Sequence, residues 1–138
     1  MTVEFVDPKS MGERDWGEEL LIGLSSGNYT MKKLTIKAGA KGGLQKHHFK
    51  DECGILLSGE LIIRYDPGNG KLTEKVVRPG ESFRFPPGSV HQEEAITECV
   101  IIECSTPHAN DRVRCEEDYG QKIEGGLPST SREDVVIL

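Results

Sequence analysis

Four side chains with metal-binding chemistry lie in two separated stretches of the chain. Gln45 and His47 are two residues apart, so on an extended strand both side chains leave the same face. Glu52 follows at a spacing that suits the next strand of an antiparallel pair, and His91 comes after the Pro-Pro-Gly turn at 86–88, which would aim a side chain inward. Two imidazoles, a carboxylate and an amide oxygen suit Zn, Fe, Mn, Co or Ni rather than Ca or Mg. We therefore predict one divalent transition metal, with Zn expected and Fe, Mn, Co or Ni as alternatives.

The spacing to Glu52 permits either His47 or His48 as the first histidine ligand. If His48 faced the metal, strand alternation would place Lys46 beside it, and an ammonium group has no lone pair to donate. His47 instead keeps Gln45 on its own face. We therefore expect His47 at the metal, and His48 turned outward or at a subunit contact.

The elements that must position these donors have the pattern of short strands joined by tight turns. Segments rich in aliphatic, β-branched or aromatic residues are expected to form strands at 29–37, 52–57, 60–65, 72–77, 82–85 and 99–104. Turns containing Gly or Pro separate them, and no long stretch has helical periodicity. Such even spacing predicts an all-β sandwich or barrel.

Length and composition favour a single compact domain. A chain of 138 residues with 36% hydrophobic residues can bury one core, and its net charge of −6 argues against nucleic-acid binding. No apolar run approaches a membrane span, and residues 1–10 carry charges and a proline where a signal peptide needs an apolar stretch. We therefore expect a cytoplasmic protein with no membrane partner. The four cysteines lack the Cys-x2-Cys spacing of zinc ribbons and are expected to be free thiols.

The metal-binding residues and the glycines around them resemble the two motifs of the cupin superfamily. The first motif matches Gly39, Gln45, His47, Glu52 and Gly59, and the second matches Gly80, Pro86, Gly88 and His91. The resemblance implies a single-domain double-stranded β-helix, or jelly-roll barrel, with short helical or irregular termini. We expect an N-terminal segment at 1–28 that packs on the barrel, the barrel itself at 29–121 and a C-terminal tail at 122–138. Cupins frequently dimerise, so a homodimer is expected.

Gln45 stands where most cupins have a first histidine, and this departure points to one branch of the superfamily. The run Leu44-Gln45-x-His47-His48 resembles the cupin domain of type II mannose-6-phosphate isomerases, which is often fused to mannose-1-phosphate guanylyltransferases. Residues 111–114, Asp-Arg-Val-Arg, fall where that family has Asp-Ile-Val-Arg. The similarity spans roughly residues 14 to 121. Phe49 and Lys50 replace a histidine and an arginine of the family pattern.

The charge distribution indicates an anionic ligand. Between Lys32 and Lys50 there are six lysines and no acidic residue, and a locally positive strand pair beside a metal would favour a small anionic sugar or sugar phosphate. Lys32 and Lys50 occupy positions where the resembling family also keeps a cation. Together with Arg114, they are the expected substrate-binding residues.

Three functions are compatible with this set of residues. In an isomerase of mannose-6-phosphate-isomerase type, the metal polarises a sugar carbonyl, Arg114 holds the phosphate, and Glu103 or Lys50 moves the proton. In an oxygenase, His47, Glu52 and His91 would form a facial triad for Fe(II). In a non-catalytic module, the metal would only orient a sugar or nucleotide, or stiffen the barrel. The isomerase is the function that we predict.

Overall fold

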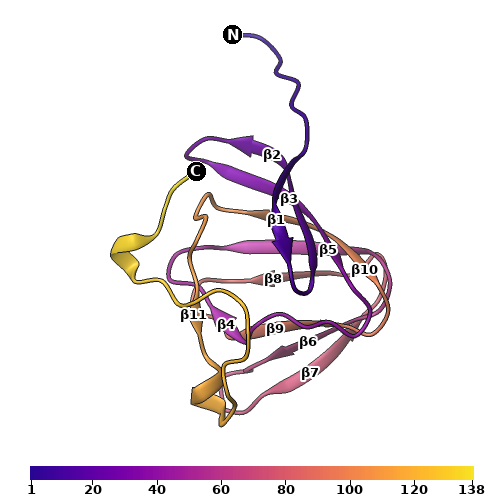
Figure 1. The fold of residues 1–138 in the computed structure, drawn as a ribbon, viewed down its shortest axis with the longest axis vertical. Coiled ribbons are helices and arrows are strands. Elements are labelled where there is room, and N and C mark those ends of the chain that lie inside the picture. Colours follow the sequence, from indigo (N-terminus) through magenta and orange to yellow (C-terminus); the bar gives the residue numbers. More distant parts are fainter.

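The computed structural model describes residues 1–138 and consists of β-strands, connecting loops and two single-turn 3-10 helices (Figure 1). The strands are β1 (Lys9–Arg14), β2 (Gly17–Ser25), β3 (Tyr29–Ile36), β4 (Gln45–Lys46), β5 (Glu52–Ser58), β6 (Leu61–Tyr65), β7 (Thr73–Val77), β8 (Ser82–Phe85), β9 (His91–Ala95), β10 (Cys99–Ser105) and β11 (Val113–Arg114). The 3-10 helices are η1 (Glu116–Tyr119) and η2 (Arg132–Asp134). No helix here has both the length and the apolar character that a membrane crossing requires.

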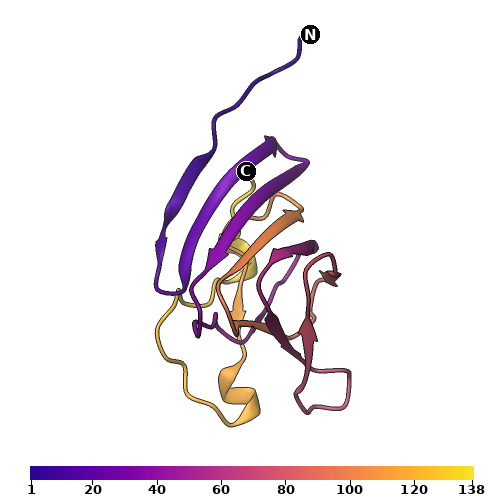
Figure 2. The ribbon, with the colours of Figure 1, turned by 90° about the vertical axis from the view of Figure 1, so that its right-hand side faces the viewer.

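Two antiparallel sheets form the body of the molecule. One has the strand order β1-β2-β3-β10-β5-β8, and the other has the order β11-β4-β9-β6-β7. Neighbours that are distant in sequence, such as β3 and β10, pair because the chain crosses repeatedly between the sheets, as in a jelly roll. Figure 2 shows the sheets one beside the other, with the N-terminal segment before β1 projecting away. The expected all-β, single-domain jelly-roll fold is confirmed.

The six strands expected from hydrophobic pattern correspond to β3, β5, β6, β7, β8 and β10, with ends that differ by one residue at most. The sequence pattern gave no strand before residue 29, yet β1 and β2 form a hairpin that extends the larger sheet through β3. It also missed β9, whose sequence His-Gln-Glu-Glu-Ala is almost entirely polar. The polar character of β9 matters because this strand carries part of the site.

Inward-facing side chains divide the space between the sheets into an apolar half and a polar half. Alternate residues of each strand point inward. At one end they form the hydrophobic core, which comprises Leu34, Ile36, Leu56, Leu61, Ile63, Val77, Phe85, Ala95, Cys99 and Ile101. At the other end the buried inward residues are polar, namely Thr30, Lys32, Glu52, His91, Glu103 and Ser105. Burial of each large aliphatic side chain contributes about 1.5–3 kcal/mol. The apolar half can therefore offset the cost of burying polar groups at the other end.

The C-terminal end of the chain docks on its own fold. Ile137 forms a β-bridge with His108, and the backbone of Leu138 bonds to both Pro107 and Gly27. The last apolar segment, residues 135–138, is therefore held by other loops of the same chain.

Candidate metal centre and its pocket

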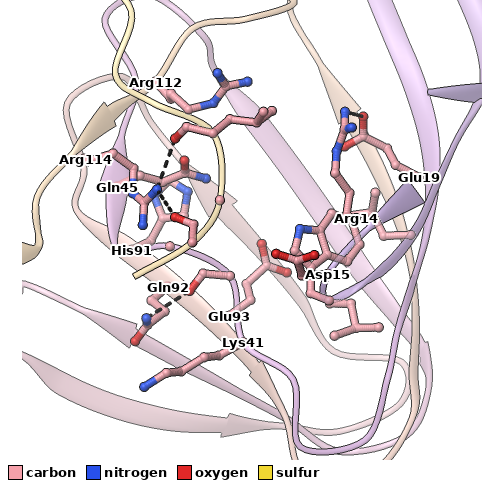
Figure 3. A pocket seen from close by; sticks show the side chains of 18 of the residues that line it. Arg14, Asp15, Glu19, Lys41, Gln45, His91, Gln92, Glu93, Arg112 and Arg114 are labelled. Carbon is pink, nitrogen blue, oxygen red and sulfur yellow. Dashed lines mark hydrogen bonds and ion pairs between the residues drawn. The ribbon is translucent and has the colours of Figure 1, made fainter. Parts of the chain in front are cut away.

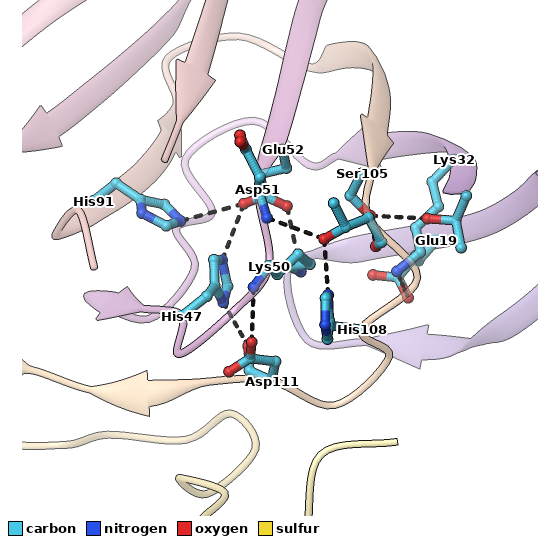
Figure 4. A network of polar contacts seen from close by, with 12 residues as sticks. Glu19, Lys32, His47, Lys50, Asp51, Glu52, His91, Ser105, His108 and Asp111 are labelled. Atoms are coloured by element: carbon cyan, nitrogen blue, oxygen red, sulfur yellow. Dashed lines mark hydrogen bonds and ion pairs between the residues drawn. The ribbon is translucent and has the colours of Figure 1, made fainter. Parts of the chain in front are cut away.

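Three strand ends deliver metal-binding side chains to one point in the polar half of the interior (Figure 4). His47 directly follows β4, Glu52 begins β5 and His91 begins β9. Nε2 of His47 lies 3.0 Å from Oε1 of Glu52, and Nε2 of His91 lies 3.5 Å from the same oxygen. All three residues are buried, and their ligand atoms lie within 4.8 Å of one another. Donors that bind one transition metal at about 2.0–2.2 Å have separations of this order.

Hydrogen bonds to backbone carbonyls fix the orientation of both imidazoles. Nδ1 of His47 bonds to the carbonyl oxygen of Asp111 at 2.5 Å, and Nδ1 of His91 bonds to that of Ser89 at 3.0 Å. A carbonyl only accepts, so each Nδ1 carries a proton, and Nε2 of the neutral ring presents a lone pair. Burial lowers the pKa of His47, which favours the neutral ring. Two lone pairs then face an oxygen of Glu52, an arrangement that fits a divalent cation between them.

Asp111 holds the loop that connects two of the donors. One of its carboxylate oxygens accepts the amide hydrogen of His48 at 2.7 Å, and the other accepts those of Phe49 and Lys50 at 2.7 and 2.9 Å. These bonds lower the pKa of Asp111 in spite of its burial, which would raise it. Sequence analysis placed Asp111 in a family motif but assigned it no role. In the structure its hydrogen bonds hold the loop that follows His47 in place.

Gln45 lines the pocket that opens from the three donors, and His48 does not. Gln45 is in register with His91 across the β4–β9 pair and lines the same pocket (Figure 3). Its proposed role as a fourth donor stays a prediction. His48 points away from the three donors, because its Nε2 hydrogen-bonds to the carbonyl of Thr130 in the tail at 2.7 Å.

Lys50 and Glu103 lie next to Glu52. Nζ of Lys50 is 3.3 Å from Oε2 of Glu52. Burial alone would lower the pKa of Lys50, but the carboxylates of Glu52 and Glu103 raise it above its ordinary value. Lys50 is therefore a fixed positive charge beside the centre. Burial, followed by the charges of Glu52 and Glu93, raises the pKa of Glu103 well above its usual range.

Glu93 is a pocket residue that the sequence interpretation missed. It is two residues from His91 on β9, so strand alternation turns both side chains to the same side. Its Oε2 is sealed from solvent and has no hydrogen-bond partner. Burial, with a smaller contribution from Glu52, raises its pKa to about 7. The same alternation rule that separated His47 from His48 would have identified Glu93, had β9 been recognised as a strand.

Lys32 is more buried than the other lysines between residues 32 and 50, and its ammonium group already contacts a carboxylate. Its Nζ is 3.8 Å from Oε2 of Glu19, and Nη2 of Arg14 is 3.6 Å from the same oxygen. Lys32 faces the polar half of the interior, opposite Glu103 in the β3–β10 pair. Its proposed contact with substrate stays a prediction.

Arg114 is engaged with the C-terminal part of the chain. Its Nε and Nη2 contact the carboxylate of Glu116 at 3.1 and 2.5 Å, and its Nη1 donates to the carbonyls of Gly125 and Leu127 at 2.9 and 3.0 Å. A Cβ on Gly126 would come within 2.9 Å of this guanidinium, so the tail packs closely against Arg114. The contacts favour a role for Arg114 in anchoring the tail. Its predicted contact with phosphate is untested.

A cavity of about 530 Å³ opens from the three donors toward solvent. This volume is in the range of ligand pockets, which measure about 300–1,000 Å³. Its lining carries charges of both signs, and of the lysine-rich stretch only Lys32, Lys41 and Lys50 contribute to it. The pocket is therefore polar and lined by charges of both signs (Figure 3), whereas the sequence had indicated a locally positive strand pair beside the metal.

Comparisons with known sequences agree with this geometry. The model of the family described as "Cupin domain" matches residues 32–103, a stretch that contains all three donors. The chain is 29% identical over 119 residues to the alginate biosynthesis protein AlgA of Pseudomonas aeruginosa, covering 83% of this chain and 24% of AlgA. It is 31% identical over 112 residues to the mannose-1-phosphate guanylyltransferase RfbM of Salmonella typhimurium, covering 78% of this chain and 22% of RfbM. The chain thus spans about a quarter of the length of these relatives.

Solved structures share the fold. The capsular polysaccharide assembling protein CapF of Staphylococcus aureus aligns with a TM-score of 0.64 at 22% identity, over 74% of this chain and 29% of CapF. An oxalate oxidase aligns with a TM-score of 0.51 at 28% identity, over 57% of this chain and 42% of the oxidase. The family match covers more than half of the chain and includes the donor cluster. The chain therefore belongs to the cupin family.

Proposed function

We propose that this cupin is a metal-dependent isomerase of a small anionic sugar, such as a sugar phosphate, of mannose-6-phosphate-isomerase type. The observation that carries the proposal is the cluster of His47, Glu52 and His91 at the inner end of an open polar pocket. Two relatives that match most of this chain are named for alginate biosynthesis and for mannose-1-phosphate guanylyl transfer, which supports a sugar phosphate as the ligand class.

In this proposal His47, Glu52 and His91 hold one divalent transition metal, with the amide oxygen of Gln45 as a fourth donor. The bound metal would supply Lewis-acid polarisation of the sugar carbonyl and the neighbouring hydroxyl. Lys50 keeps a fixed positive charge beside Glu52. That charge balances the carboxylate and stabilises negative charge that develops on a substrate oxygen.

Proton transfer between adjacent sugar carbons needs a side chain that accepts a proton from one carbon and returns it to the next. Glu103, proposed for this step from the sequence, lines the pocket next to Glu52. Glu93 lines the same pocket with an unpaired carboxylate oxygen. We assign the transfer to this pair of carboxyls. Lys50, the other sequence candidate, is better suited to donating a hydrogen bond, because it keeps its charge.

The test is turnover without oxygen. Metal-loaded protein is incubated anaerobically in deuterated water with mannose 6-phosphate and a panel of other sugar phosphates. The proposal predicts conversion of at least one of them to its ketose or epimer, with deuterium at the carbon next to the carbonyl. His48→Ala is the matched control and should keep activity, whereas His91→Ala should lose it. No turnover across the panel with metal bound would contradict the isomerase.

Two alternative functions are tested by the same material. The likeness to an oxalate oxidase, together with two histidines and one carboxylate at the centre, favours an oxygen-dependent enzyme as second candidate. Such an enzyme would be inactive until a redox-active metal and oxygen are supplied. A binding module would raise its melting temperature with a sugar phosphate but form no product.

A homodimer in the cytoplasm completes the proposal. Three large apolar side chains, Tyr29, Ile55 and Leu57, are exposed on the outer face of the larger sheet, where a second subunit could cover them. Light scattering coupled to size-exclusion chromatography tests the dimer. A mass of one chain at micromolar concentration would contradict it.

A further inference from the structure

One arginine of the pocket has no partner of opposite charge. Arg112 immediately precedes β11 and lines the pocket together with Arg14 at the end of β1 (Figure 3). The ion pairs of the structure do not include Arg112. Its side chain makes a single hydrogen bond, from Nη1 to the carbonyl of Pro128, and that bond is 3.4 Å long. A guanidinium offers five N–H donors in a planar fork, so most of those of Arg112 are unused.

The charges near Arg112 are unbalanced. Burial, and then the positive charge of Arg14, lowers the pKa of Arg112, although an arginine still keeps its proton. The two carboxylates whose charges act on Arg112, those of Glu19 and Asp111, are already engaged. Glu19 is shared between Arg14 and Lys32 through one oxygen, and Asp111 accepts three backbone amides. Arg112 is therefore exposed to the positive charges of Arg14 and Arg114, while the two carboxylates that act on it are bound to other groups.

We propose that Arg112 binds the phosphate group of a phosphate-bearing ligand, with Arg14 on the lining of the same pocket adding positive charge. The planar guanidinium can donate two parallel hydrogen bonds to one phosphate, and the anion would neutralise the excess charge. Arg114 has its donors committed to Glu116 and the tail. The identity of the ligand rests on the proposed function; the anion site itself does not.

The experiment measures binding of inorganic phosphate to the full-length, metal-free protein by isothermal titration calorimetry at low ionic strength. Arg112→Gln should weaken binding at least tenfold, and Arg112→Lys, which keeps the charge but loses the planar fork, should give an intermediate affinity. Lys41→Gln is the matched control, because Lys41 is an exposed cation of the same pocket. Its affinity should stay within twofold of the wild type if a specific site binds the anion.

A second readout separates ligand binding from a structural role. Without phosphate, Arg112→Gln should be at least as stable to urea as the wild type, because it removes an unpaired charge from among other cations. With phosphate, only the wild type should gain stability. Any one of four results would overturn the proposal. Three concern phosphate affinity: no detectable binding by the wild type, unchanged binding by Arg112→Gln, or a loss of affinity in Lys41→Gln equal to that in Arg112→Gln. The fourth is a lower stability of Arg112→Gln than of the wild type without phosphate. The phosphate titration uses metal-free protein, so a failed isomerase test does not change the evidence for the anion site. A failed phosphate titration likewise does not change the result of the isomerase test.

Discussion

Replacement of Asp111 should weaken both the fold and the metal centre. The carboxylate accepts three backbone amides of the loop at 48–50, and its own carbonyl orients His47. Hydrogen bonds to a charged group contribute about 1.5–3 kcal/mol each. The freed amides belong to residues that are half-buried or exposed and can bind water. We therefore expect Asp111→Ala to lower the free energy of unfolding by about 3–5 kcal/mol, below the simple sum.

Asp111→Asn makes the expectation sharper. An amide keeps one acceptor oxygen and turns an NH2 group toward an amide that needs an acceptor, so it can retain two of the three bonds at best. We expect a loss of about 2–3 kcal/mol, between the wild type and the alanine variant. Asp51→Asn is the control, because that carboxylate pairs only with Arg84 at the surface, where solvent screening leaves an ion pair with little effect on stability.

Urea denaturation followed by fluorescence of Trp16, the single tryptophan, measures these changes. Trp16 packs against the hydrophobic core, so its emission should report loss of the fold. Metal affinity should also fall, by about 10–100-fold, because partners that orient a ligating histidine have effects of this size. An Asp111→Ala variant that loses under about 1 kcal/mol and retains its metal affinity would refute the assigned role.

Two further predictions concern the turns and the tail. Gly59→Ala should destabilise the fold by more than about 2 kcal/mol, because a Cβ there would lie 2.2 Å from the carbonyl of Glu98. Gly70→Ala is the control: Gly70 also has a positive φ but lies in open space, so this variant should lose about 1–2 kcal/mol. Urea denaturation measures both. Burial would raise the pKa of Glu116, but the hydrogen bonds from Arg114 lower it below its ordinary value. The stabilisation by this ion pair is therefore present above about pH 4.3 and lost as pH falls through the lowered pKa, so the stability difference between wild type and Glu116→Gln should vanish in acid.

The strands that the sequence predicted are those whose inward positions carry aliphatic residues. In β3, β5 and β10 the alternation of Leu, Ile and polar residues is strong enough to give both the element and its inward face. β9 was missed because the positions that face inward hold His91 and Glu93, which serve the site rather than the core. β1 combines charged residues with glycine and is stabilised by pairing with β2 across a bulge, which a local pattern does not reveal.

The residues of the candidate site also divide into those that the sequence could predict and those that it could not. The spacing of His47, Glu52 and His91 was sufficient to group them, because strand alternation and one turn determine where such side chains point. The roles of the arginines were not accessible in this way. Arg114 finds its partners in the tail, and Arg112 is notable only for lacking one. Both facts depend on which distant segments meet in the folded chain.

The most direct test of the central claim is the metal content of the purified protein, measured by mass spectrometry after exposure to Zn, Mn and Fe and removal of excess metal. Wild type and His48→Ala should each retain about one transition metal per chain, and His47→Ala and His91→Ala should lose most of it, because each removes one of few strong donors. Full retention of metal in His91→Ala, or a loss in His48→Ala equal to that in His47→Ala, would contradict the metal centre described here.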